Sequence, residues 1–268
     1  MKKLTGLLMA ASILLLGACG TGDKKEDVGS GADKKEVVVG LDDTFVPMGF
    51  RDDNGELTGF DVDLATAVFD LTDTKVTFQP IDWAMKETEL DNGTIDMIWN
   101  GYTVNDERKK KVLFSDTYMQ SYQVLVTKKD SGIDSLDQMK DKVLGAQEGS
   151  SGYKIFTEQP EVLQDIVKDN DATLYASFNE AFIDLETGRI DGVLIDSVYA
   201  EYYLTKMNKL DQFNLINSTF AQEGFAVGVR KDDEKLAEKI NEGLAELREN
   251  GEFKKISEKW FGKDVTID

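Results

Sequence analysis

Histidine is absent from this 268-residue sequence, and cysteine occurs once, at Cys19. Without histidine the chain cannot assemble a Ser-His-Asp or Cys-His catalytic group, nor a zinc site with imidazole ligands. A single cysteine cannot form a disulfide within the chain. Any binding or catalysis therefore depends on carboxylates, hydroxyls, amides, basic side chains and aromatic rings, and we predict neither a metal nor a cofactor.

Positive charge is also scarce. The sequence holds 31 Lys and Arg against 51 Asp and Glu, which gives a formal net charge of −20 at pH 7. Such an acidic surface repels the phosphates of nucleic acids, so we exclude nucleic-acid binding. The length and the 41% of hydrophobic residues are sufficient for two modest domains with buried cores.

The apolar stretch near the amino end is too short to span a bilayer. Residues 7–18 are uncharged, mostly Leu, Met, Ala and Ile, and they follow the basic pair Lys2 and Lys3. A basic start followed by a short apolar run is typical of a secretory signal peptide. We therefore expect residues 1–18 to be a leader that is removed from the mature protein.

The leader runs directly into Leu16-Gly17-Ala18-Cys19. This segment resembles the lipobox of bacterial lipoproteins, and the resemblance implies a diacylglyceryl group on the Cys19 sulfur and cleavage just before it. The following residues, 19–35, are rich in Gly, Asp and Lys and contain almost no apolar residue. Such a segment cannot bury a core, so we expect it to be a flexible tether.

Strand-like and helix-like segments alternate through the rest of the chain. Apolar runs and period-two patterns predict strands at 37–41, 75–79, 95–99, 122–127, 143–146, 173–175, 193–195 and 225–229. Apolar residues at helical spacing predict helices at 61–71, 83–92, 151 onward, 179–187, 197–207, 233–249 and 252–261, with Asp61 placed to cap the first. This alternation predicts two α/β halves, each with a mostly parallel sheet between layers of helices.

Polar motifs at the predicted strand ends form a set. They are GFDVDL at 59–64, NGTID at 92–96, TVNDER at 103–108, FSDTY at 114–118 and GRIDGVLID at 188–196. In this order and spacing they resemble the polar amino-acid-binding proteins of bacterial ABC importers, which are family 3 of the extracellular solute-binding proteins. The resemblance covers residues 36–261 and departs at Thr117, where the family usually has proline.

This resemblance implies the type II periplasmic-binding-protein fold, in which two Rossmann-like α/β lobes are joined by two crossover strands. Lobe 1 would comprise residues 36–121 and 224–268, and lobe 2 would comprise residues 122–223. Open α/β sheets bind ligands beyond the carboxyl ends of their strands. Two facing lobes would therefore form a cleft that can close by hinge motion.

The carboxylate of an α-amino acid favours the planar two-bond fork that only arginine offers. The resemblance assigns this role to Arg108, with the Thr103 hydroxyl as a second donor. The segment Gly-Ser-Ser-Gly at 149–152 lies where a strand turns into a helix. Its backbone N–H groups and the hydroxyls of Ser150 and Ser151 could hold the same carboxylate from lobe 2.

The ammonium requires acceptors. The resemblance assigns it to Asp196, which ends a predicted strand of lobe 2, and we expect support from the Gly101 carbonyl and Asp42. The acidic cluster of Asp42, Asp43 and Glu148 favours a ligand with a polar or cationic side chain. Because Arg108 and Asp196 come from opposite lobes, an amino acid would complete the closed state.

The ligand side chain would lie between Phe45 and Trp83, and the resemblance also assigns Asn100 and Gln147 to the lining of the pocket. Some of these residues have purely structural alternatives. Arg108 belongs to the charged run 107–111, which would ordinarily lie on a solvated face, Asp196 could cap the next helix, and aromatic rings are often core. We interpret four further aspartates as turn and cap residues: Asp61, Asp63, Asp96 and Asp191.

These features predict a non-enzymatic, monomeric lipoprotein, anchored through Cys19 to the outer face of the cell membrane. It would capture a free L-amino acid and deliver it to the permease of an ABC importer. Two alternatives remain. Some dehydratases acting on cyclic carboxylates resemble this family, but they need a general acid in the cleft, whereas Asp42 and Asp196 are assigned to the ammonium. A receptor sensor domain would be expected to carry a second apolar span.

Overall fold

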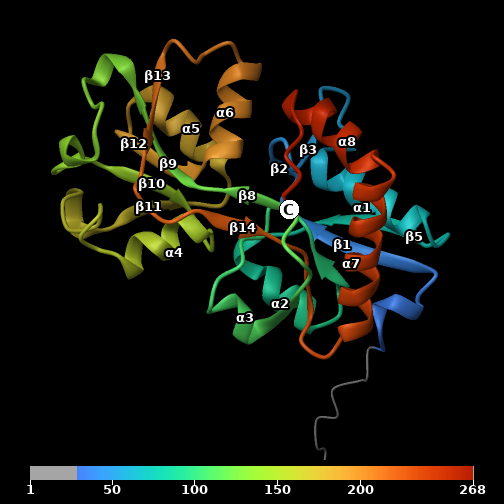
Figure 1. Ribbon diagram of the computed structural model, residues 1–268. Helices are drawn as coiled ribbons and strands as arrows, with labels where there is room; N and C mark the ends of the chain where they lie inside the picture. The colour runs from blue at the N-terminus through green and yellow to red at the C-terminus, as the bar shows by residue number, and fades with distance from the viewer. Residues whose placement is uncertain (1–28, 268) are drawn as a thin grey trace, which may run out of the picture.

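A computed structural model describes residues 29–267 (Figure 1). The expected signal peptide and Cys19 lie outside the described residues. The described chain forms two α/β lobes, each built on a five-stranded sheet, with a two-stranded ribbon between them. The two-lobe α/β architecture expected from the sequence is therefore confirmed.

Lobe 1 is built on a sheet with the strand order β5-β1-β6-β15-β7. These strands are β1 (Glu36–Leu41), β5 (Lys75–Pro80), β6 (Met97–Ile98), β7 (Val112–Phe114) and β15 (Gly228–Arg230). The helices of this lobe are α1 (Phe60–Asp70), α2 (Lys86–Asp91), α3 (Arg108–Lys111), α7 (Glu234–Glu249) and α8 (Glu252–Phe261), with short 3-10 turns at Gly31–Asp33 and Trp83–Met85. A small sheet of β2 (Thr44–Phe45), β3 (Gly49–Arg51) and β4 (Leu57–Thr58) follows β1.

Lobe 2 repeats this plan with the strand order β11-β10-β12-β9-β13. Its strands are β9 (Gln123–Lys128), β10 (Leu144–Gln147), β11 (Ala172–Tyr175), β12 (Gly192–Asp196) and β13 (Phe213–Asn217). Its helices are α4 (Ser151–Glu158), α5 (Phe178–Thr187) and α6 (Ser197–Lys206), with 3-10 turns at Lys129–Ser131, Leu136–Met139 and Lys168–Asn170.

The two crossover strands are β8 (Met119–Ser121) and β14 (Glu223–Phe225), which pair antiparallel with each other. The strand that follows each crossover, β9 in lobe 2 and β15 in lobe 1, is antiparallel to both of its neighbours. The other four strands of each sheet run in one direction, as the sequence predicted. Through each crossover the chain enters a lobe from the cleft side, so the strand that follows the crossover runs away from the cleft.

Alternating side chains of the central strands face different helices, as the pleat of a strand requires. In lobe 1, Val37 and Val39 belong to the core that α1 and α7 complete, whereas Val38 packs with residues of α2 on the other face. In lobe 2, Val193 faces the core with α5 and α6, and Leu194 faces the core with α4. The carboxyl ends of these strands are therefore held rigidly at the cleft.

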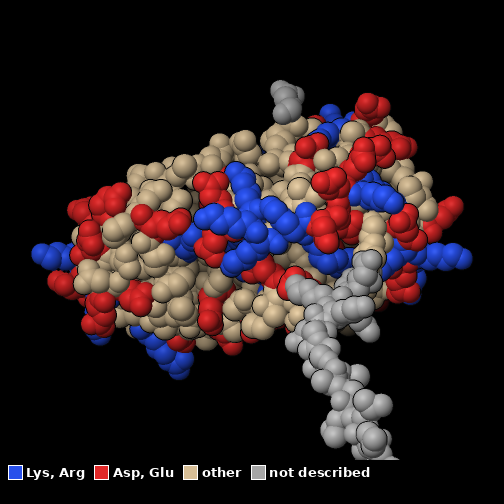
Figure 2. Space-filling view, turned by 90° about the horizontal axis from the view of Figure 1, so that it is seen from below, with Lys and Arg blue, Asp and Glu red and all other residues tan. Residues whose placement is uncertain are grey.

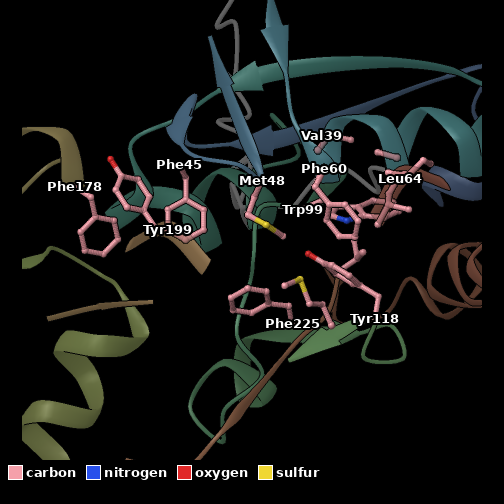
Figure 3. Close-up of a cluster of buried hydrophobic side chains, with 14 of the residues drawn as sticks. Val39, Phe45, Met48, Phe60, Leu64, Trp99, Tyr118, Phe178, Tyr199 and Phe225 are labelled. Atoms are coloured by element: carbon pink, nitrogen blue, oxygen red, sulfur yellow. The ribbon is translucent and has the colours of Figure 1, made fainter. Parts of the chain in front are cut away.

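The two lobes touch each other through aromatic side chains at the cleft. Phe45 of β2 lies with its ring centroid 6.0 Å from Phe178 of α5 and 5.5 Å from Tyr199 of α6. Figure 3 shows this trio on one side of Met48, with Trp99 and Tyr118 of the same buried cluster on the other side. Because these three rings are buried and come from both lobes, the structure represents a closed arrangement.

Two details differ from the sequence-based expectations. The N-cap of α1 is Gly59, not Asp61, because the buried Asp61 carboxylate instead accepts hydrogen bonds from Gly101 N (2.7 Å) and Tyr118 Oη (2.9 Å). The single strand expected at 225–229 is divided into β14 and β15, because the chain leaves the crossover ribbon before it joins the sheet of lobe 1.

The last part of the segment expected to be a tether lies against lobe 1. The Asp233 carboxylate accepts hydrogen bonds from Ser30 Oγ (2.5 Å) and Gly31 N (2.8 Å), and Lys34 pairs with Asp96 at 2.7 Å. The ordered body therefore begins a few residues before Glu36. Within residues 29–267, none of the helices combines the length and the apolar character needed to cross a membrane.

Acidic side chains are scattered over the underside of both lobes, and a band of Lys and Arg lies near its middle (Figure 2). One ion pair joins the lobes: Glu107 of lobe 1 pairs with Lys154 of lobe 2 at 2.8 Å. Glu107 also pairs with Lys111 of its own lobe, again at 2.8 Å. These two lysines hold the pKa of Glu107 at about 2. Glu107 is exposed and Lys154 is partly exposed, so solvent and salt screen the ion pair between the lobes and its contribution to closure is small.

Candidate ligand-binding site

A small cavity lies between the lobes. All eleven residues that the sequence assigned to ligand binding line it, together with one more, Phe178: the lining is Asp42, Phe45, Trp83, Asn100, Gly101, Thr103, Arg108, Gln147, Ser150, Ser151, Phe178 and Asp196. These residues lie up to about 150 positions apart in the chain. The fold therefore brings the whole set of candidates to one place, while their individual roles remain predictions.

The lining comes from the carboxyl ends of strands. Asp42 follows β1, and Asn100 and Gly101 lie just after β6 in lobe 1. Gln147 and Asp196 are the last residues of β10 and β12 in lobe 2. This is the edge where open α/β sheets place their ligands, because loops and helix starts there leave polar groups free to converge.

Arg108 begins the short helix α3 and is only 5% exposed, although its neighbours Lys109 to Lys111 are exposed. Its guanidinium donates to the Thr103 carbonyl at 3.0 Å and to the Gly149 carbonyl at 3.1 Å. The group also lies over the ring of Tyr102, 4.5 Å from the centroid. The alternative of a solvated charged run therefore does not hold for Arg108.

The serines opposite Arg108 lie at the start of α4. The Ser151 hydroxyl accepts a 3.1 Å hydrogen bond from the Thr103 hydroxyl across the cleft. The Ser150 hydroxyl accepts a hydrogen bond from Tyr153 N and so caps the helix, but its own hydrogen can still be donated. Hydroxyls, a guanidinium and a helix amino end thus converge from both lobes on one end of the cavity, which suits an anion.

Asp196 is the acidic residue that lines the cavity from lobe 2. It is 5% exposed and accepts a 3.1 Å hydrogen bond from Gln123 Nε2. Burial, and then the nearby Glu223 carboxylate, raise the pKa of Asp196 to about 7, although Gln123 and Arg108 act in the other direction. Asp196 occupies the N-cap position of α6 without capping it through its side chain, so the carboxylate is available for another partner.

Gly101 and Asn100 are fixed by buried hydrogen bonds. Gly101 has a φ of +56°, and its N–H donates to Asp61, which leaves its carbonyl as an available acceptor. The Asn100 side chain accepts from Asp42 N at 3.1 Å, while its buried Nδ2 has no hydrogen-bond partner among the described residues. The first aspartate of the sequence set, Asp61, therefore acts beneath the site by holding Gly101 in place.

The remaining aspartates interpreted as turn or cap residues do not line the cavity. Asp63 accepts from Trp260 Nε1 at 2.6 Å, and Asp191 accepts from Val143 N at 2.8 Å. Asp96 accepts from Val38 N at 3.1 Å and pairs with Arg230 at 3.0 Å. Their role is structural, as expected, but it operates through tertiary contacts in place of local caps.

Sequence reasoning missed two residues, Phe178 in the site and Gln123 beside it. Phe178 begins α5 and lines the cavity opposite Phe45. Gln123 is fully buried at the start of β9 and donates to Asp196, to Ser151 and, at 3.4 Å, to Glu223 on the crossover strand β14. A glutamine among the apolar residues of a predicted buried strand was the one available signal, because a buried amide needs partners.

Comparison with known proteins agrees with this arrangement. Residues 37–263 match the family described as bacterial extracellular solute-binding proteins, family 3. A substrate-binding protein of an ABC uptake transporter from Streptococcus pneumoniae, solved with bound histidine, is 53% identical; the match covers 87% of this chain and 95% of that one, with a TM-score of 0.87.

Curated relatives are similar over nearly the same span. The arginine-binding extracellular protein ArtP of Bacillus subtilis is 32% identical, with 97% of this chain and 98% of ArtP covered. The L-cystine-binding protein TcyJ of Escherichia coli is 34% identical, with 86% of this chain and 84% of TcyJ covered. Fold, cleft and sequence agree, and the chain belongs to family 3 of the bacterial extracellular solute-binding proteins.

Proposed function

We propose that this protein captures a free L-amino acid in the interlobe cleft and delivers it to the permease of an ABC importer. The observation that carries the proposal is the placement of Arg108 and Asp196 on opposite lobes around one cavity. A zwitterion offers a carboxylate to the first and an ammonium to the second. Only the closed form satisfies both ends, so binding favours closure.

The carboxylate is assigned to Arg108, Thr103, Ser150 and Ser151, and the ammonium to Asp196 and the Gly101 carbonyl. Asp42, which the sequence offered as a further ammonium acceptor, is assigned to the ligand side chain. In the structure, Thr103 bonds directly to Ser151, and Arg108 bonds to the Gly149 carbonyl. An amino acid would take up these donors in place of the cross-lobe partners they have now. The same groups would therefore hold the lobes together through the ligand.

The side chain of the ligand is assigned to the part of the cavity lined by Phe45, Trp83, Asn100 and Gln147, with Phe178 added by the structure. Of the acidic cluster noted in the sequence, only Asp42 lines the cavity, since Asp43 pairs with Arg51 at 2.6 Å and Glu148 is exposed. A buried carboxylate beside aromatic rings suits a polar or cationic side chain. Histidine, found bound in the Streptococcus pneumoniae protein, and arginine, for which ArtP is named, are the first candidates.

The amino-terminal sequence supports the location. Residues 1–18 resemble a leader and the segment ending in Cys19 resembles a lipobox, so a lipid on Cys19 would hold the protein at the outer face of the membrane beside the permease. Two acyl chains anchor far more stably than one, because each buried CH₂ contributes about 0.8 kcal/mol. The part of the expected tether that precedes Ser30 would let the body reach the permease.

The decisive experiment is calorimetric titration of the purified protein with the twenty amino acids, L-cystine and L-ornithine. We expect one or a few polar or cationic amino acids to bind with one site per chain and to raise the melting temperature. The proposal fails if the folded protein binds none of them. Chromatography of the recovered ligand should show it chemically unchanged, whereas a product would favour the dehydratase alternative.

A further inference from the structure

Lys86 is a buried cation that ligand binding does not explain. It is the first residue of α2, it is 2% exposed, and it does not line the cavity. Its Nζ donates to the Trp83 carbonyl of lobe 1 at 2.9 Å and to the Gly149 carbonyl of lobe 2 at 3.0 Å. The ammonium therefore bridges the two lobes at the edge of the candidate site.

Burying the Lys86 ammonium away from water is energetically unfavourable, and its partners compensate only in part. The nearest carboxylate, Glu87, lies 3.6 Å away, but Glu87 also faces Arg108 at 3.9 Å and accepts from Tyr102 Oη at 3.0 Å. Burial, and then the positive charge of Arg108, lower the pKa of Lys86 to about 7, with Lys111 adding to this and Glu87 opposing it. An apolar side chain would fill this position in α2 without that cost.

The partner of Lys86 on lobe 2 is shaped for close approach. Gly149 has a φ of +70°, and a Cβ at this position would lie 3.0 Å from Ala84 Cα and 3.3 Å from Lys86 Nζ. The Gly149 carbonyl accepts from both Lys86 and Arg108, which are two cations of lobe 1. The turn that leads into Ser150 and Ser151 is thus pressed against the beginning of α2.

We propose that Lys86 is a positioning residue that latches the Gly149 turn of lobe 2 to lobe 1 in the closed form. The latch holds the amino end of α4, with Ser150 and Ser151, opposite Arg108, where both can reach one carboxylate. This inference rests on the proposed function. When the lobes part, Lys86 loses the Gly149 carbonyl and regains water, so the contact belongs to the closed state alone.

A contact that exists only after closure changes ligand release more than ligand capture. Removing the hydrogen bond while also removing a poorly paired buried charge should have a moderate net effect. One net hydrogen bond of about 0.5–1.5 kcal/mol corresponds to a change of roughly two- to tenfold. We therefore expect Lys86→Met, which keeps an unbranched stem of similar length, to release ligand roughly two to ten times faster with an unchanged association rate.

Stopped-flow fluorescence tests this directly, because Trp83 lines the cavity. The probes are L-histidine and L-arginine, or whichever amino acid binds in the titrations. Lys110→Met removes an exposed lysine of the neighbouring helix α3 and serves as the charge-matched control, with wild-type release expected. Equal release rates in wild type and Lys86→Met, with both folded and binding, would overturn the latch.

The acid–base behaviour gives a second readout that simple loss of packing would not produce. If closure lowers the pKa of Lys86 toward 7, the closed form binds fewer protons than the open form above that pH. Closure then strengthens as pH rises from 7 to 8.5. Release from the wild-type protein should slow over this range, and the dependence should be absent in Lys86→Met. The same slope in both proteins contradicts the proposal.

Two glycine substitutions test the lobe 2 side of the latch while Lys86 itself is left unchanged. Gly149→Ala places a methyl group against Ala84 and Lys86, whereas Gly132→Ala has the same left-handed strain, at φ +73°, with nothing within 4 Å. Gly149→Ala should release ligand faster than Gly132→Ala, and equal rates would contradict close packing of the turn on α2.

Small-angle scattering without ligand separates the latch from the proposed function. The radius of gyration of Lys86→Met should exceed that of the wild type. If no amino acid binds the wild type, the proposed function is wrong, and this difference alone then decides the latch: a larger radius supports it and equal radii overturn it.

Discussion

The Gln147 side chain, at the end of β10 in lobe 2, donates a 2.7 Å hydrogen bond to the Asp42 carboxylate, which follows β1 in lobe 1. Asp42 also accepts from Thr44 N and Thr44 Oγ1 on its other oxygen. Burial nevertheless raises the pKa of Asp42 above its usual range. Among the described residues, the Asp42 carboxylate thus has only neutral hydrogen-bond donors and no cation beside it. A cation in the cleft would stabilise its charged form.

Asp42→Asn should therefore alter specificity. We expect L-arginine to lose about tenfold or more in affinity, because a charge-assisted hydrogen bond contributes about 1.5–3 kcal/mol. L-glutamine, whose side chain is neutral, should lose much less affinity. Calorimetric titration of both ligands against wild type and variant measures the difference. Equal weakening for every amino acid would instead place Asp42 at the ammonium, as the sequence suggested.

Asp196 makes ligand binding dependent on pH. Burial and Glu223 raise the pKa of Asp196 to about 7 in the closed arrangement, and an ammonium beside it would lower that pKa. Between these two values the bound form carries fewer protons than the free form, so affinity rises with pH up to about 7 and then levels off.

Titrations from pH 5 to pH 7 should show this dependence, with affinity falling by up to about tenfold for each pH unit toward acid. Asp196→Asn should bind more weakly at pH 7 and lose the slope. Asp63→Asn serves as the control, since Asp63 bonds Lys259 and Trp260 away from the cavity. A slope that survives Asp196→Asn would assign the proton to another group, with Glu223 the next to test.

The amino-acid sequence allowed most of this architecture to be predicted, for a physical reason. Strands and helices alternate with clear periods, and the carboxyl ends of parallel strands in one sheet share an edge. Residues at strand ends such as Asp42 and Asp196 must therefore meet near the cleft once two lobes face each other. That is why residues far apart in the chain could be grouped before their geometry was known.

What could not be predicted depends on contacts between the lobes or between distant segments. Asp61 was placed as a cap from its local position, but its partners Gly101 and Tyr118 lie 40 and 57 residues away. The sequence pattern around Gln123 predicts a buried strand, but it does not show which groups the buried amide contacts. Lys86 is indistinguishable in sequence from an exposed helix residue, since its carbonyl partner on Gly149 becomes a neighbour only when the lobes close.

Cys19→Ala tests the anchor. Without the thiol no diacylglyceryl group can be attached, so the protein should move from the membrane fraction to the medium or the soluble periplasm. The purified variant should melt at the wild-type temperature and bind its amino acid with unchanged affinity, because Cys19 precedes the described body. Cell fractionation with immunoblotting measures the distribution, and retention of Cys19→Ala in the membrane would show that another segment anchors the chain.

Arg108→Lys should be a severe change despite the retained charge. Lysine cannot form two parallel bonds to one carboxylate, and it cannot replace the stacking of the guanidinium on Tyr102. The loss of one charge-assisted bond should lower affinity roughly ten- to a hundredfold. Arg108→Ala should be worse, because the ligand carboxylate would be buried without a cation.

The Arg108 variants should also lose stability of the folded protein itself. Arg108 donates to the carbonyls of Thr103 and Gly149, so melting temperatures measured without ligand should also fall by a few degrees. The exposed neighbour offers a control: Lys109→Met should keep both affinity and melting temperature. Affinity close to wild type in Arg108→Lys would show that the carboxylate is held elsewhere, and Thr103 and Ser151 would then be the residues to substitute next.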